Sequence, residues 1–353
     1  MAKLINSLFP KKEPIKIGHL TPLSGEFSYF GEWEKEGVDL AAEEINKKGG
    51  VNGQKVAVVR DDDRLDPALS KAVFERMIET EKVPAVIGSP SSDVVLAVAP
   101  VADKNQVVML TAIAGSVKIS TASNYLFRIY PTTVEEGEQL ALIASQSGHK
   151  RAAIIYLNNS YGIELAKSVK RKTAEYGIDI LAMEGYRKDN TDFSEQLGRI
   201  KEKDPEVIFL LGWPNDMSLI LSQAREIGLN PKYFAPDTFE DPRMLKTAGR
   251  ITEGVVYVAP EENLAPEFIK KFKKKYKKEP NIYNALCYDA FNLLVAAVKM
   301  GGNNGNAIRD ELLKIKDYQG ATGIITFNEH GDAVNRPLKV KTIKEGASIP
   351  YQK

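Results

Sequence analysis

The 353-residue sequence has few of the side chains from which metal sites and disulfide frameworks are built. Its one cysteine, Cys287, excludes an intrachain disulfide framework and a cysteine-rich metal site. Cys287 falls in an apolar helical pattern, so we expect a buried core thiol. The three histidines, His19, His149 and His330, have no cysteine, histidine or carboxylate at metal-ligand spacing. The sequence therefore predicts no metal site.

Catalytic motifs and long apolar runs are also missing. There is no Gly-x-Ser-x-Gly elbow, no Walker loop, and no Gly-x-Gly-x-x-Gly after the first predicted strand. We therefore predict no catalytic residue and no cofactor. A net charge of +1 argues against a general nucleic-acid or membrane-surface binder. The longest apolar stretch, 285–300, is interrupted by Asp289, Asn292 and Lys299, which predicts a core helix and not a membrane span.

The N-terminal stretch 1–14 has scattered lysines and only a short apolar patch, so no secretory signal is recognisable in it. Two interpretations follow: a cytosolic protein, or an exported protein from which the signal has been removed. The acidic residues 61–63 follow a predicted strand and offer a conceivable cation site. Loop hydrogen bonding and helix capping explain them better.

What the chain does contain is a repeated alternation of strands and helices. Short apolar strands are predicted at 15–20, 55–60, 84–87 and 107–111, with amphipathic helices between them. The same rhythm restarts after 125–130 and continues to 254–258. Short β-α-β connections predict parallel sheets covered on both faces, so the fold class is α/β with two doubly wound halves.

The stretch 86–100 joins a buried strand to a small-residue turn and a helix that begins at a serine N-cap near Ser92. The start of a helix presents unpaired backbone N–H groups, which suit a carboxylate or a phosphate. An ordinary capped helix explains the same pattern. Residues elsewhere in the chain are needed to distinguish an anion site from a simple helix cap.

The chain resembles the leucine/isoleucine/valine-binding family of periplasmic substrate-binding proteins, which have the type I fold and serve ABC importers. The resemblance covers about 15–343 and is carried by many short motifs in one order. These motifs include Thr21-Pro-Leu-Ser-Gly25, the run 41–53, Asp61-Asp-Asp63 with Asp66-Pro67, Val86-Ile-Gly88 with Ser92, Asn158-Asn-Ser-Tyr-Gly162, the run 223–229, Tyr288-Asp-Ala290 and the run 327–332.

The resemblance implies two lobes joined by three crossovers, with a ligand in the cleft between them. The crossovers would fall near 129–133, 258–263 and 326–337. The N-terminal lobe would be 15–131 plus 262–327, the C-terminal lobe 132–261 plus 328–353, and 1–14 a tail. Closure on the ligand would then be a hinge motion.

The resemblance also implies a set of ligand-binding positions. In the first lobe the carboxylate-binding serine matches Ser92 and the first-loop aromatic matches Phe30, beside Tyr29. The strand-end loop contributes Ile113 and either Gly115, where the family often has threonine, or Ser116. The second lobe contributes three positions, which are two aromatic walls and an acid for the ligand ammonium: Tyr161, Trp213 and Asp237. The plain alternatives are helix-start packing for Tyr161, core packing for Trp213 and helix capping for Asp237.

The implied function is capture of a small amino acid-like ligand, branched-chain or aromatic, and its delivery to the membrane permease of an ABC importer. We expect a monomer in the periplasm or on the extracellular surface, with no nucleic-acid partner. Three alternatives stay open: a binder of simple aliphatic or aromatic carboxylates on the same fold, a cytosolic sensor of amides or amino acids, and an enzyme of the doubly wound class.

Overall fold

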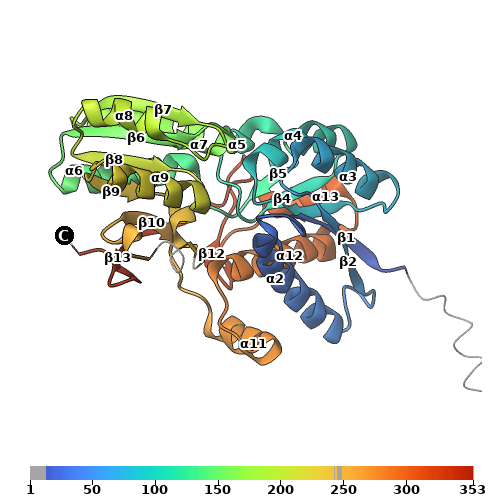
Figure 1. The fold of residues 1–353 in the computed structure, drawn as a ribbon. Helices are drawn as coiled ribbons and strands as arrows, with labels where there is room; N and C mark the ends of the chain where they lie inside the picture. Colours follow the sequence, from blue (N-terminus) through green and yellow to red (C-terminus); the bar gives the residue numbers. More distant parts are fainter. Residues whose placement is uncertain (1–12, 242, 245–248, 353) are drawn as a thin grey trace, which may run out of the picture. The chain divides into compact units, whose positions relative to one another are not determined.

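A computed structural model of the chain describes residues 13–241, 243–244 and 249–352. The predicted tail lies outside the described residues except for 13 and 14. The chain divides into two compact units, coloured along the sequence in Figure 1. Unit 1 holds the residues up to 114 together with 118–130 and 262–335, and unit 2 holds 115–117, 131–261 and 336 onward.

The sheet of unit 1 has the strand order β2-β1-β3-β4-β5, and all its strand pairs are parallel. Its strands are β1 (Ile15–Thr21), β2 (Val56–Asp62), β3 (Ala85–Gly88), β4 (Val108–Thr111) and β5 (Leu126–Arg128). All residues of β3 and β4 are buried, as expected for central strands of a parallel sheet. This part of the predicted fold is confirmed.

Helices of unit 1 cover the sheet in two packed groups. In one group α3 packs against α4, and in the other α12 packs against α2 and α13. The bounds are α2 (Ser28–Lys47), α3 (Pro67–Glu79), α4 (Ser92–Asn105), α5 (Ile119–Ala122), α11 (Pro266–Tyr276), α12 (Ile282–Gly301) and α13 (Gly305–Leu313). The thiol of Cys287, on α12, is fully buried, which confirms the expected core cysteine.

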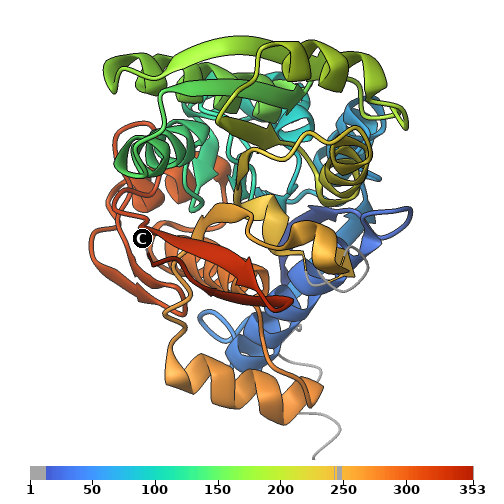
Figure 2. The ribbon, with the colours of Figure 1, turned by 60° about the vertical axis from the view of Figure 1, so that its left-hand side comes forward.

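Unit 2 contains a sheet with the strand order β14-β13-β10-β9-β8-β6-β7. The pairs among β6 to β10 are parallel, whereas β13 and β14 add an antiparallel edge, red in Figure 2. The strands are β6 (Arg151–Leu157), β7 (Asp179–Tyr186), β8 (Val207–Leu211), β9 (Lys232–Ala235), β10 (Val256–Pro260), β13 (Leu338–Lys344) and β14 (Ala347–Pro350).

Two separate apolar cores show that helices cover both faces of this sheet. Helices α6 and α7 share one core with the sheet, and α8 and α9 share the other. The helical segments of unit 2 are α6 (Thr133–Gln146), α7 (Ser160–Glu175), α8 (Ser194–Glu202), α9 (Pro214–Glu226) and the 3₁₀ turns η1 (Asp237–Glu240) and η2 (Gly249–Thr252). The doubly wound prediction is thus confirmed for each unit.

The short elements that were not predicted include α5, η2, β14 and the strand β11 (Tyr318–Gly320), which pairs with β12 (Gly323–Ile325). The assignment of 328–335 to the second lobe also needs correction. These residues belong to unit 1, because the backbone of Arg128 bonds to Gly331 and Ala333, and the guanidinium of Arg128 pairs with Asp332 at 2.6 Å. Among the described helices, none combines the length and the apolar character needed to cross a membrane.

Candidate functional site

The strand ends of unit 1 bring hydroxyl groups and a helix start to one edge of its sheet. Strand β3 ends at Gly88 and β4 at Thr111, and parallel strands end at the same edge. The hydroxyl of Thr111 donates to the carbonyl of Ser89 at 3.0 Å and accepts the N–H of Ala114 at 3.0 Å. One side chain therefore ties the loop before α4 to the loop after β4, which contains Ile113.

The N-cap of helix α4 lies one residue before Ser92, the residue predicted to bind the ligand carboxylate. Ser91 is the N-cap, and its hydroxyl accepts the N–H of Val94 at 3.5 Å. Ser92 is the first helical residue and is 4% exposed. The capping explanation therefore falls on Ser91, and the predicted role of Ser92 does not compete with it.

Phe30 lies in an aromatic cluster, which comprises Tyr29, Phe30, Trp33 and Tyr283 of unit 1. The ring of Phe30 is 4.7 Å from Tyr29 and 5.3 Å from both Trp33 and Tyr283, centroid to centroid. Trp33 and Tyr283 stack with an interplanar angle of 4°. Trp33 and Tyr283 were not among the residues predicted from the sequence. The spacing of Tyr29, Phe30 and Trp33 on one helix face was a usable signal, whereas Tyr283 comes from a distant helix.

Two acids are buried near this end of unit 1. Burial raises the pKa of Glu34 to about 8 and that of Asp63 to about 6. An oxygen of Glu34 lies 3.5 Å from Nε2 of His19. Burial lowers the pKa of His19. Asp62 accepts the N–H groups of Leu23 and Arg64. Asp62 and Asp63 thus accept hydrogen bonds from backbone N–H groups of nearby loops. In the described part of the chain there is no cluster of side chains that could hold a metal ion.

In unit 2 the structure brings together two predicted residues and one that was not predicted. The hydroxyl of Tyr161 lies 2.9 Å from a carboxyl oxygen of Glu136 and 3.2 Å from one of Asp237. Tyr161 is on α7, Glu136 on α6 and Asp237 on η1, and all three are buried. The N-cap of η1 is Pro236, so capping does not explain Asp237.

Burial dominates the electrostatics of this group. It raises the pKa of Glu136 well above its ordinary range, and the nearby Asp237 carboxyl raises it further. Burial likewise raises the pKa of the Tyr161 hydroxyl. Glu136 was missed because it stands in a run of acids at a helix start, a pattern typical of exposed residues that favour the helix dipole. No sequence signal distinguished it from Glu135.

Trp213 follows β8 and is the N-cap residue of α9, with Pro214 in the first turn. It is half-buried, and Nζ of Lys188 lies 5.1 Å from its ring centroid. The hydroxyl of Thr238 donates to the carbonyl of Gly212 at 2.7 Å, which ties the Trp213 loop to the Asp237 turn. Trp213 and Asp237 therefore lie on two loops that this hydrogen bond joins.

The strand-end loop around Gly115 groups with unit 2, whereas Ile113 belongs to unit 1. The carbonyl of Gly115 accepts the N–H of Thr133 at 2.8 Å. A Cβ atom at position 115 would lie 3.4 Å from the Tyr161 ring, an ordinary van der Waals distance, so this loop lies directly against Tyr161. Ser116 is fully buried. Whether 115 or 116 contacts a ligand stays a prediction.

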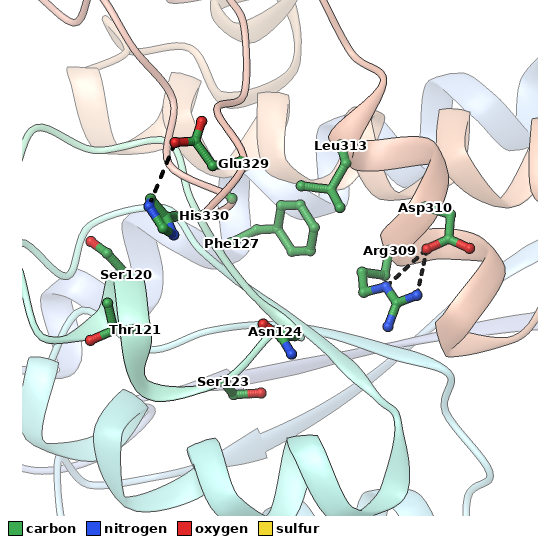
Figure 3. A pocket seen from close by; sticks show the side chains of 11 residues that line it. Ser120, Thr121, Ser123, Asn124, Phe127, Arg309, Asp310, Leu313, Glu329 and His330 are labelled. Atoms are coloured by element: carbon green, nitrogen blue, oxygen red, sulfur yellow. Dashed lines mark hydrogen bonds and ion pairs between the residues drawn. The ribbon is translucent and has the colours of Figure 1, made fainter.

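A cavity of about 440 Å³ opens elsewhere in unit 1 (Figure 3). None of the predicted ligand-binding residues lines it. Its side chains already contact one another: Arg309 pairs with Asp310 at 2.6 Å, and the imidazole of His330 lies 3.7 Å from Glu329. We therefore assign no ligand to this cavity.

Two doubly wound α/β units, each with polar and aromatic side chains at the carboxyl ends of its strands, are the architecture of type I solute-binding proteins. The sequence pattern of the periplasmic binding protein family matches residues 14–348. The chain belongs to that family, as the sequence resemblance predicted.

Individual relatives agree with this assignment. A leucine-binding protein from Thermotoga maritima superposes with a TM-score of 0.88 at 29% identity, covering 96% of this chain and 98% of that one. A branched-chain amino acid transporter substrate-binding protein from Streptococcus pneumoniae, in complex with isoleucine, gives 0.86 at 27% identity, over 95% and 98% of the two chains. The leucine-, isoleucine-, valine-, threonine- and alanine-binding protein of Pseudomonas aeruginosa is 25% identical over 92% of this chain and 88% of its own length.

Proposed function

We propose that this protein captures an α-amino acid with an apolar side chain, of the leucine, isoleucine and valine type, and delivers it to an ABC importer. The observation that carries the proposal is the buried Asp237 carboxyl beside Tyr161 in unit 2. A buried carboxyl that can accept hydrogen bonds from an ammonium is a specific feature of a site for amines. The relatives that bind leucine, isoleucine and valine support the choice of ligand.

Unit 1 supplies the complementary chemistry. The start of α4, with Ser91 as its cap and Ser92 as its first residue, presents backbone N–H groups and hydroxyls for a ligand carboxylate. The aromatic cluster on α2 and α12 supplies an apolar surface, and Trp213 of unit 2 supplies another. In this proposal the ligand engages both units, and a hinge motion at the chain crossovers brings the units onto it.

The proposal includes four properties of the protein. It acts outside the cytoplasm, as the family name implies, and its macromolecular partner is the permease of the importer. It binds without chemical turnover. It works as a monomer.

Isothermal calorimetry tests the ligand class. We expect leucine, isoleucine or valine to bind, with 4-methylpentanoate and benzoate as controls that retain the carboxylate and lack the ammonium. Binding of either control as tightly as the amino acids would contradict the proposal and favour a carboxylate binder. Native mass spectrometry of the freshly purified protein checks the same point, because a retained ligand would have the mass of an amino acid.

A further inference from the structure

In the group formed by Tyr161, Glu136 and Asp237, two carboxyls share the single hydroxyl hydrogen of Tyr161. Tyr161 has one hydroxyl hydrogen, yet its oxygen lies within hydrogen-bond distance of two carboxyls, at 2.9 and 3.2 Å. A second hydrogen is needed for both short contacts to be favourable. A protonated carboxyl supplies it, as two carboxyls close together cannot both be ionised at low cost.

The surroundings of Glu136 favour its neutral form. It is fully buried, and its second oxygen, Oε1, meets no hydrogen-bond donor among the described residues. An ionised carboxylate with a bare buried oxygen is costly, whereas the neutral acid is tolerated. Burial and the Asp237 carboxyl raise the pKa of Glu136, and they outweigh the Tyr161 hydroxyl and the Asp237 backbone N–H, which lower it.

The elements around Glu136 supply no compensating positive charge that the structure records. Helix α7 contributes Tyr161 and η1 contributes Asp237, while β9 and β10 contribute the apolar side chains of Phe234 and Val258 to the same side of unit 2. On α6 itself, Glu135 closes the capping box with Thr132. Glu138 pairs with Lys172 at 3.2 Å and is 41% exposed. A positive charge that reached this group from a ligand would therefore meet two carboxyls.

We propose that Glu136 is a second acid of the ammonium site, protonated in the free protein, and that it releases its proton to solvent when a ligand ammonium binds beside Asp237. The inference rests on the proposed function, because it requires a ligand that carries an ammonium. The ligand cation takes the place of the proton, so affinity rises with pH until the free protein itself loses that proton. A simple carboxylate brings no cation and gains nothing from this exchange.

Calorimetry of leucine binding at pH 7, in two buffers with different ionisation enthalpies, counts the protons released. The wild-type protein should release on the order of one proton per leucine bound, and E136Q should release none. Glutamine keeps the shape and the hydrogen-bonding capacity of the protonated acid but cannot ionise. The matched control is E138Q, an exposed acid on the same helix, which should release as many protons as the wild type.

A pH series sharpens the test, because neither end of leucine titrates between pH 5.5 and 8.5. The dissociation constant of wild type and E138Q should fall by up to about tenfold per pH unit, and that of E136Q should stay flat. Equal proton release by wild type and E136Q would overturn the inference, and so would leucine binding by the wild type without proton release. If the wild-type protein binds no amino acid at all, the proposed function and this inference fail together.

Discussion

The strand ends of the two units differ in chemistry although their folds share one plan. Unit 1 ends its strands in hydroxyls and the start of a long helix, around Thr111, Ser91 and Ser92. Unit 2 ends its strands beside two buried carboxyls, those of Glu136 and Asp237. One unit thus offers donors and the other offers acceptors. A zwitterion is the small ligand that uses both, and this is the physical content of the proposed function.

The comparison extends to buried acids whose pKa is raised, which are Glu34 and Asp63 in unit 1 and Glu136 in unit 2. Glu34 in unit 1 lies beside His19, and we propose no ligand-binding role for it. Glu136 in unit 2 lies beside Asp237, which we assign to the ligand ammonium. The difference separates an acid that acts on stability alone from one that also acts on binding.

The first prediction concerns Glu34. Its unfolded form loses its proton near pH 4.5, whereas the folded form keeps it until about pH 8, so its stabilising contribution is complete below pH 4.5 and is lost as pH rises across that interval. Urea denaturation should show the free energy of unfolding falling by on the order of 4 kcal/mol between pH 5 and 8 from this group. E34Q should flatten that slope without changing the proton release on leucine binding.

The control for Glu34 is Glu43 on the same helix. Hydrogen bonds from Lys275 and Lys47 lower the pKa of Glu43 to about 2, so it is ionised in both states from pH 5 to 8. E43Q should therefore keep the wild-type slope. An E34Q profile as steep as that of the wild type would show that Glu34 is not the titrating group.

The second prediction concerns the acid that we assign to the ammonium. D237N should weaken leucine binding by about 3 kcal/mol, roughly a hundredfold, because the ammonium loses its charged acceptor. Calorimetry measures this, with D189N as a control, since Asp189 is an exposed acid of the same unit. Unchanged leucine affinity in D237N would remove the basis for assigning acceptors to unit 2.

The third prediction concerns the aromatic wall. W213A should weaken leucine binding by about 2 kcal/mol, and W213F by less, because phenylalanine retains much of the apolar face. The protein has two tryptophans, Trp33 and Trp213, one in each unit. Comparing the leucine-induced fluorescence change in W33F and W213F shows which unit's tryptophan senses the ligand. Equal affinities in W213A and wild type would place Trp213 outside the site.

The smallest effect is expected at the start of α4. S92A should weaken leucine binding by about 1 kcal/mol, because the backbone N–H groups of the helix start remain available. S91A should instead lower the free energy of unfolding by about 1 kcal/mol through loss of the cap, with less effect on affinity than S92A. The reverse pattern would exchange the roles of these two serines.

Much of the fold could be predicted because strand and helix periods in this chain are regular. Short apolar runs predict the buried strands β3 and β8, and a serine N-cap predicts the start of α4. Each of these signals lies within a few residues of the element that it predicts. The short exposed strands β11 and β14 have no such pattern, so they were missed. The assignment of 328–335 failed because it depends on Arg128, which is distant in sequence.

The candidate site divides in the same way. The family motifs led to Tyr161 and Asp237, which the structure places 3.2 Å apart. Glu136 and Tyr283 could not be found that way, because their proximity to the predicted residues arises from the packing of helices in three dimensions. Trp33 is not part of a family motif, and only its spacing from Phe30 on one helix face pointed to it. Burial is what gives Glu136 its chemistry, and a sequence of acids at a helix start predicts exposure.

The central claim is that unit 1 binds the carboxylate of an amino acid and unit 2 binds its ammonium. A crystal structure of the leucine complex tests it most directly. We predict that the ligand nitrogen lies within about 3 Å of a carboxyl oxygen of Asp237, and the ligand carboxylate within about 3 Å of the first N–H groups or hydroxyls of α4. A ligand held in the opposite orientation, or one that contacts neither Ser92 nor Asp237, would contradict it.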